Sequence, residues 1–207
     1  MRIKENMTRL EPKRLRGLIL WGVLFLLCLM LQYFELSKLL RFDRHLIDAG
    51  QWWLIISGNL VHLGWHHLWL NMAGLALVAV FFSPYYRFSE WLILLWLSSL
   101  FVGGGLYWFN PELIWYVGLS GVLHGLFIAG GWQEYKHYGK SGALLLALIV
   151  AKLIWEQNMG AMPGSEAVSG GRVMVDAHLY GALSGGVFVA CGELYRGINK
   201  WQGLWRI

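Results

Sequence analysis

Long apolar stretches separated by short polar or basic segments dominate this 207-residue chain. We predict six helices from them, at residues 17–34, 59–82, 91–109, 118–133, 141–155 and 175–194. The first is long enough to cross a hydrocarbon core of about 30 Å. The stretches at 118–133 and 141–155 are shorter, so the helix at 118–133 is expected to begin below the membrane surface. The pattern predicts an all-α polytopic membrane protein with six transmembrane helices.

The connecting segments differ in character. Residues 37–56 mix charged side chains with Trp52 and Trp53, which is typical of a segment lying in the membrane interface. Residues 83–87 and 110–112 are predicted turns, and 136–140 a basic loop. Residues 159–173 are rich in glycine, and we expect a flexible loop that could act as a lid.

Composition and charge agree with a membrane protein. Hydrophobic residues make up 57% of the chain and charged residues 14%. Twelve of the 17 lysines and arginines fall on one predicted side, which places both termini in the cytoplasm. The net charge of +5 is therefore assigned to topology and contact with anionic lipid, and no nucleic-acid partner is expected.

One domain accounts for the whole chain. Residues 1–16 are predicted to be a cytoplasmic tail, 17–194 the membrane domain, and 195–207 a second cytoplasmic tail. A secretory signal peptide is not favoured, because no small-residue cleavage site follows the first apolar run. Cys28 and Cys191 both lie in apolar runs and are expected to be free thiols.

A serine between glycines opens the helix predicted at 118–133. Gly121 and Gly125 follow Ser120 at a four-residue spacing, which removes side chains from one stripe and allows another backbone to come close. The last predicted helix has a matching stripe at Gly181 and Gly185, one turn after His178. Packing of the two stripes would bring Ser120 and His178 to one depth.

This pair fits acyl transfer. A serine hydroxyl needs a base to take its proton, and neutral histidine suits that task near pH 7. His178 is the preferred base because its helix carries the small-residue stripe, and His124, four residues after Ser120, is the alternative. Neither motif contains an acid placed to complete a triad, so the sequence predicts a dyad.

Other polar side chains lie in apolar stretches. His67 and Asn71 share one face of the helix predicted at 59–82, and their donors could stabilise an oxyanion. His62 is expected to lie toward the outer end of the same helix. For His62, hydrogen bonding to another helix is as well supported as a role in function. Lys152 and Glu156 form an i, i+4 pair, which could either neutralise itself or recognise a polar group of a substrate.

These motifs resemble those of the rhomboid family of intramembrane serine proteases. The resemblance rests on Gly118-Leu119-Ser120-Gly121, on Ala177-His178 followed by Gly181 and Gly185, and on His62, His67 and Asn71 in this order. It implies a six-helix rhomboid bundle in which Ser120 is the nucleophile and His178 the base. It also implies that His67 and Asn71 surround the oxyanion.

The sequence departs from the common rhomboid pattern at several positions, and in these and other features it resembles the rhombosortase branch. His124 stands where tyrosine is common, and Trp52-Trp53 lacks the adjacent arginine often found in the first outer loop. The compact form, the run from Gly118 to Gly125 and the segment from Lys152 to Gln157 also resemble that branch. The resemblance implies a bacterial inner-membrane enzyme whose substrates are membrane-anchored proteins with a C-terminal Gly-Gly motif, a transmembrane helix and a basic tail.

Other functions compete with this hypothesis. A haem or quinone protein could use the histidines of the apolar stretches, but it leaves the Ser120 motif unexplained, and we expect no cofactor and no metal. The histidines concerned are His62, His66, His67, His124 and His178. A rhomboid protease with other single-pass substrates and an inactive relative that binds membrane clients are further alternatives.

Overall fold

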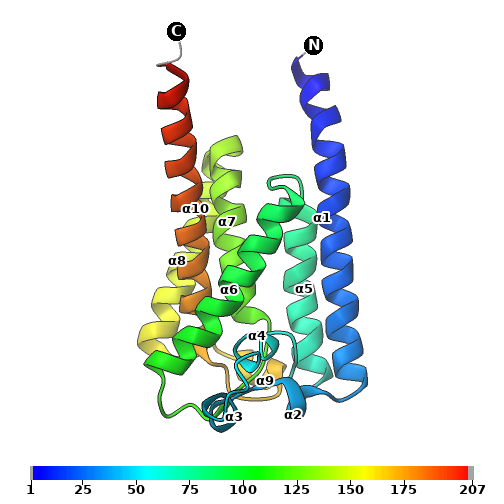
Figure 1. The fold of residues 1–207 in the computed structure, drawn as a ribbon, viewed down its shortest axis with the longest axis vertical. Helices are drawn as coiled ribbons and strands as arrows, with labels where there is room; N and C mark the ends of the chain where they lie inside the picture. Colours follow the sequence, from blue (N-terminus) through cyan, green and yellow to red (C-terminus); the bar gives the residue numbers. More distant parts are fainter. Residues whose placement is uncertain (1, 205–207) are drawn as a thin grey trace.

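The computed structural model describes residues 2–204, with side chains from residue 14 to residue 198. Its framework consists of long helices that run side by side (Figure 1): α1 (Arg2–Tyr33), α5 (Trp65–Phe82), α6 (Phe88–Phe109), α7 (Ser120–Tyr138), α8 (Lys140–Met159) and α10 (Val175–Leu204). The described N- and C-terminal segments lie at the same end of the bundle. The short helices gather at the opposite end, which we call the loop end.

Four of these helices contain a segment long and apolar enough to cross a membrane, namely Arg14–Tyr33, Trp65–Phe82, Phe88–Phe109 and Lys140–Met159. Helices α7 and α10 are 19 and 30 residues long. They carry polar residues and glycines that lower their hydropathy. The chain is an all-α, multi-pass membrane protein, as the sequence predicts.

Two helices are longer than predicted. Helix α7 continues to Tyr138 and α8 begins at Lys140, so the predicted loop at 136–140 reduces to a tight turn at Gly139. Gly139 has a φ of 61°, a conformation that favours glycine. The prediction of a short helix at 141–155 was therefore wrong, because polar residues at the helix ends concealed its true length.

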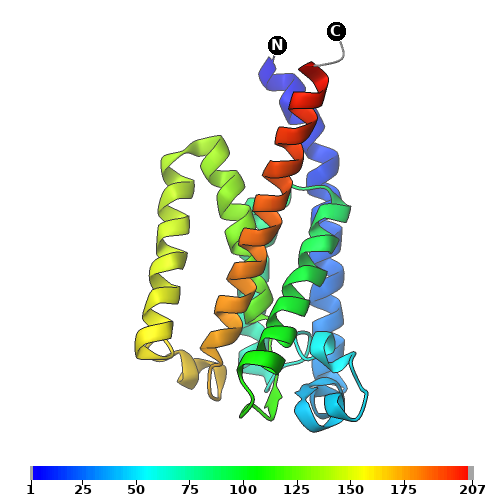
Figure 2. The same ribbon diagram turned by 60° about the vertical axis from the view of Figure 1, so that its left-hand side comes forward.

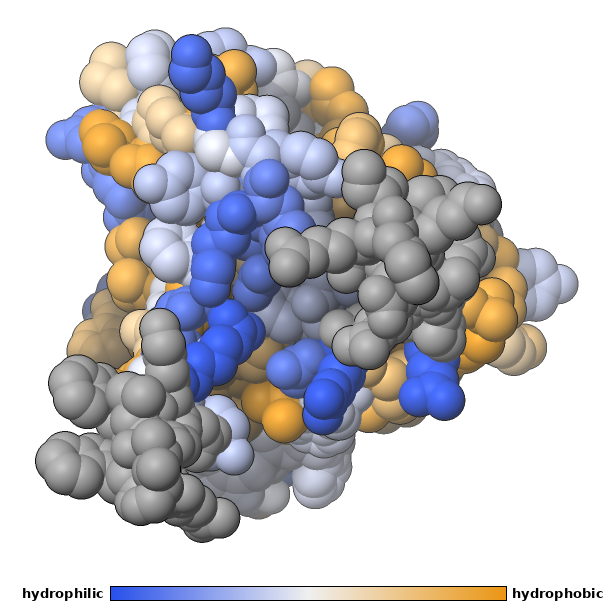
Figure 3. Space-filling view, turned by 90° about the horizontal axis from the view of Figure 1, so that it is seen from above, coloured by the Kyte–Doolittle hydropathy of each residue, from blue (hydrophilic) through white to orange (hydrophobic). Residues whose placement is uncertain are grey.

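The predicted tails are also largely helical. Helix α1 starts at Arg2, within the tail predicted at 1–16, and α10 extends to Leu204. Residues 205–207 of the predicted C-terminal tail lie outside the described residues. Figure 3 views this end of the bundle, where hydrophilic residues gather between the terminal segments. Exposed basic residues toward this end are Arg14, Arg16, Lys136, Lys140 and Arg196 on the helices and Arg87 immediately before α6.

The loop end is built from short elements. They are α2 (Ser37–Leu40), β1 (Phe42–Asp43), α3 (Arg44–Asp48), α4 (Leu54–Ser57), β2 (Trp115–Tyr116) and α9 (Ser165–Ser169), with β1 and β2 antiparallel. The segment at 37–56 therefore packs on one end of the bundle, in agreement with its amphipathic pattern. The Arg44 guanidinium donates to the carbonyls of Leu106, Tyr107, Asn110 and Leu113, which ties this segment to the end of α6.

Helix α5 begins later than predicted. It starts at Trp65, so Asn59 and His62 lie in the segment before it and not on the helix. Asn59 is buried and donates to the carbonyls of Ile55 and Ile56 and, across to α6, to that of Ser99. These hydrogen bonds of the Asn59 side chain stabilise the turn that precedes α5. Gly64, with a φ of 178°, is the extended residue immediately before the helix.

Helices α7 and α10 pack backbone against backbone, as their glycine stripes predict. A Cβ added to Gly121 would lie 2.7 Å from the Ala177 carbonyl oxygen, and one on Gly125 would lie 2.8 Å from the Gly181 oxygen. A Cβ on Gly181 would overlap the Gly121 carbonyl group. Absent side chains therefore set the separation of the two helices.

Helix α8 is attached differently. It packs mainly on α7, to which the turn at Gly139 joins it, and lies at the outside of the bundle (Figure 2). Of its 20 residues, only Gly142, Leu153 and Glu156 are buried. Most of the helix surface is consequently available to lipid.

Candidate active site

A cavity of about 1140 Å³ opens toward the loop end of the bundle. Its walls come from α5, α7, α8 and α10, together with residues 109–117 and the segment around α9. Polar side chains from four helices line it: His67, Asn71, Ser120, His124, Lys152, Glu156 and His178. The fold therefore collects polar residues that are far apart in the sequence around one cavity.

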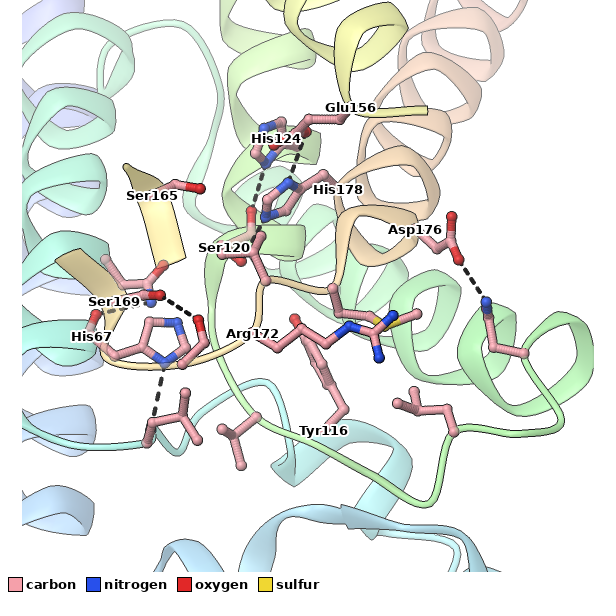
Figure 4. Close-up of a pocket in the computed structure, with 18 of the residues that line it drawn as sticks. His67, Tyr116, Ser120, His124, Glu156, Ser165, Ser169, Arg172, Asp176 and His178 are labelled. Carbon is pink, nitrogen blue, oxygen red and sulfur yellow. Dashed lines mark hydrogen bonds and ion pairs between the residues drawn. The ribbon is translucent and has the colours of Figure 1, made fainter. Parts of the chain in front are cut away.

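Ser120 and His178 are in hydrogen-bond contact across the seam between α7 and α10. The His178 Nε2 lies 3.0 Å from the Ser120 Oγ (Figure 4). Ser120 is the first residue of α7, and His178 lies in the first turn of α10. The close approach of the glycine stripes just beyond both residues holds the two side chains together.

The chain reaches Ser120 through an unusual backbone conformation. Gly118 has a φ of 128°, which L-residues rarely adopt, and a Cβ there would lie 2.9 Å from the His67 Nε2. The buried Tyr116 hydroxyl donates to the Gly118 carbonyl at 2.8 Å. Glycine is therefore required at position 118 both by the turn and by the histidine beside it.

His67 presents a donor toward this turn. The Leu63 N–H points at the His67 Nδ1 at 3.4 Å, so Nδ1 acts as the acceptor and a neutral ring carries its proton on Nε2. That nitrogen faces the backbone at Gly118, two residues before Ser120. Asn71 is buried one turn further along α5, and its Nδ2 donates to the His67 carbonyl.

His62 does not line the cavity. Its ring is fully buried and meets the His67 ring edge-on, with 5.2 Å between the centroids. Neither nitrogen of His62 has a hydrogen-bond partner among the described residues. The structure therefore places His62 behind His67, as a packing neighbour of that ring.

His124 lies beside the catalytic candidates but does not contact the hydroxyl. Its Nδ1 is 2.7 Å from the carbonyl oxygen of Ser120, one turn earlier in α7. Its ring stacks on that of His178, with centroids 4.3 Å apart and an interplanar angle of 19°. Of the two candidate bases, only His178 has a nitrogen on Ser120 Oγ.

The pair from α8 lies in the same cluster. Lys152 Nζ is 2.7 Å from Glu156 Oε1, which is the predicted i, i+4 contact. Glu156 Oε2 is also 2.9 Å from His178 Nδ1, and Lys152 Nζ is 3.1 Å from His124 Nε2. These contacts to His178 and His124 could not be predicted from the sequence, because they join residues of different helices. A spacing along one helix does not tell how that helix is rotated against its neighbours.

The cluster has some features of a metal site. Ligand atoms of His124, Glu156 and His178 lie within 4.8 Å of one another. The Lys152 ammonium lies among these atoms, at 2.7–3.4 Å from each. A cationic side chain of the protein therefore occupies the position that a metal ion would take.

A comparison with known protein families identifies the family of the chain. A family model described as the Rhomboid domain matches residues 49–193, which include every residue of the cluster. A search of curated proteins returned no matching sequence.

Proposed function

Since the chain belongs to the rhomboid family of intramembrane proteases, we propose that it is a serine endopeptidase in which Ser120 is the nucleophile and His178 the base. The observation that carries this proposal is the 3.0 Å contact between Ser120 Oγ and His178 Nε2 inside a cavity. A hydroxyl within hydrogen-bond reach of an imidazole is the arrangement that nucleophilic catalysis needs.

The reaction would proceed by acyl transfer. Ser120 Oγ attacks the scissile carbonyl carbon as its proton passes to His178 Nε2, and the same proton then goes to the leaving amine as the C–N bond breaks. Water attacks the acyl-enzyme in the second half, with His178 again acting as base. The cycle restores both side chains.

Developing negative charge on the substrate oxygen would be held by donors at the start of α7. As the first residue of the helix, Ser120 has an N–H without an intrahelical partner, and the positive end of the helix dipole lies there. His67, with its proton on Nε2, and Asn71 line the same cavity. Removing one such donor typically lowers kcat by about 100-fold or more.

For the substrate, we favour proteins anchored by a C-terminal Gly-Gly motif, an apolar helix and a basic tail. The support comes from the resemblance to rhombosortases and from the physical cost of cleavage. A helix must be unwound before its backbone can reach a serine, and glycine lowers that cost by about 1 kcal/mol per residue relative to alanine. The proposed enzyme would act in a bacterial inner membrane with both termini in the cytoplasm. The basic residues near the end of the bundle that carries both terminal segments support this orientation.

Co-expression with a reporter that carries this tail tests both levels of the proposal. We expect cleavage by the wild type and loss of cleavage with Ser120→Ala and with His178→Ala. Replacing Gly-Gly in the reporter by Leu-Leu should abolish cleavage if the enzyme is a rhombosortase. Efficient cleavage of the Leu-Leu reporter would favour a rhomboid protease of broader specificity, and client processing that survives Ser120→Ala would favour a non-catalytic client-binding protein.

A further inference from the structure

Glu156 is a buried carboxylate with both oxygens engaged. Its side chain is only 2% exposed, with Oε1 bound to Lys152 and Oε2 bound to His178 Nδ1. A buried charge is tolerated where it is paired and hydrogen-bonded. The two contacts supply that pairing, and they direct one oxygen of the carboxylate at the nitrogen of His178 that faces away from Ser120.

These contacts fix where the proton of His178 resides. An ionised carboxylate can only accept hydrogen bonds, so His178 Nδ1 must be the donor in the 2.9 Å contact. The neutral ring then has no proton on Nε2, the nitrogen 3.0 Å from Ser120 Oγ. Glu156 therefore selects the one tautomer in which His178 can accept the serine proton.

Lys152 completes the arrangement. His124 donates from Nδ1 to the Ser120 carbonyl, which leaves its Nε2 as an acceptor for the Lys152 ammonium at 3.1 Å. The same ammonium donates to Glu156 Oε1 and favours the ionised form of the carboxylate. Lys152 Nζ also lies 3.4 Å from His178 Nδ1. Both nitrogens carry protons in this arrangement, so this is a packing contact and not a hydrogen bond.

We infer that Glu156 is a positioning residue for His178 and that Lys152 holds its carboxylate, so that the site operates as a Ser-His-Glu relay in place of the predicted dyad. This inference rests on the proposed protease function. During attack, the proton of Ser120 Oγ moves to His178 Nε2, and Glu156 stays ionised and stabilises the imidazolium ion. The proton then leaves with the amine, so Glu156 never takes part in covalent chemistry.

The alternative role for the pair is recognition of a polar group on the substrate. The geometry disfavours it for Glu156, whose two oxygens are already bound inside the cluster and whose side chain is almost inaccessible. Recognition would affect KM, whereas positioning of the base affects kcat. The two roles can therefore be separated by kinetics.

The test uses the purified full-length chain in lipid nanodiscs with a fluorogenic substrate of the reporter sequence. We expect Glu156→Gln to lower kcat about 100-fold with KM changed less than twofold, because an amide can present its NH₂ to Nδ1 and stabilise the wrong tautomer. Lys152→Met should lower kcat about tenfold. The matched control is Glu35→Gln, an exposed acid that does not line the cavity, with an expected change of less than twofold.

A double-mutant cycle identifies the residue through which Glu156 acts. In a His178→Ala background, Glu156→Gln should cause no further loss, since the group that it positions is already absent. Undiminished kcat in Glu156→Gln, a rise confined to KM, or a full additional loss in the His178→Ala background would overturn the inference. If Glu156→Gln fails to fold, Glu156→Asp keeps the charge and should retain more activity than Glu156→Ala, and equal activities of these two would also overturn it.

The outcome for Glu156 is separable from that for the proposed function. If Ser120→Ala is inactive while Glu156→Gln is fully active, the protease assignment stands and the relay is wrong. If Ser120→Ala still cleaves the substrate, the protease assignment itself fails.

Discussion

Two kinds of helix packing meet at the site: α7 and α10 form a closely packed pair, and α8 packs loosely beside them. Helices α7 and α10 touch through backbone at Gly121, Gly125, Gly181 and Gly185, whereas α8 buries only three of its residues. The first pair supplies Ser120 and His178, and α8 supplies Lys152 and Glu156. Backbone contact thus sets the distance between nucleophile and base, while side-chain contacts of α8 bring the carboxylate to the histidine.

The two kinds of packing should differ in how easily they can shift. A packed backbone seam has few alternative arrangements, since even one added methyl group must displace a carbonyl. A lipid-facing helix that is tied by a tight turn at one end can shift more easily at the other. We therefore expect the Ser120–His178 contact to tolerate changes on α8, and to be lost when the seam is widened.

Widening the seam should have the largest effect. Gly181→Ala would place a methyl group on the Gly121 carbonyl, at a cost of about 1–3 kcal/mol in stability and about 100-fold or more in activity. Thermal unfolding and reporter cleavage measure both. Gly186→Ala is the matched control, because nothing lies within 4 Å of a Cβ at that position, and it should leave both unchanged. Equal effects of the two substitutions would show that the seam does not set the geometry.

Changing the stacked histidine should have an intermediate effect. His124→Ala removes both the ring that stacks on His178 and the hydrogen bond to the Ser120 carbonyl, so we expect about tenfold lower kcat. His124→Tyr keeps an aromatic ring there and should stay within about threefold of the wild type. A complete loss of activity in His124→Ala, on the scale of His178→Ala, would instead support His124 as the base.

The lipid face of α8 should be nearly insensitive. Leu148 is 60% exposed, so Leu148→Ala is expected to change reporter cleavage less than twofold. Cleavage of the reporter in nanodiscs measures this directly. A loss comparable to that of Glu156→Gln would mean that α8 is held by its lipid-facing side and that the side-chain contacts to His178 are secondary.

The sequence predicted the seam because its signal is local. Four-residue glycine spacings next to Ser120 and His178 specify a close crossing without knowledge of the rest of the bundle. The position of Glu156 could not be predicted in the same way. Its i, i+4 neighbour Lys152 accounts for its charge on one helix, and the second contact depends on how α8 is rotated against α10.

The predicted boundaries of two helices were wrong for a related reason. The end of α7 from Gln133 to Tyr138 is polar and resembles a loop in an apolar chain, yet it is helical up to Tyr138. Asn59 and His62 lie in an apolar stretch and resemble helix, yet buried hydrogen bonds of Asn59 and the extended Gly64 place them before α5. Periodicity and hydropathy locate the spans, while single polar contacts decide where they begin.

The central claim is that the hydroxyl of Ser120 is a nucleophile activated by His178. Fluorophosphonate labelling of the protein in nanodiscs, followed by mass spectrometry of the peptides, tests it most directly. We predict one adduct, on Ser120 Oγ with loss of fluoride, at a rate at least about 100-fold lower in His178→Ala. Labelling of another residue, or labelling of Ser120 at the same rate without His178, would contradict the account.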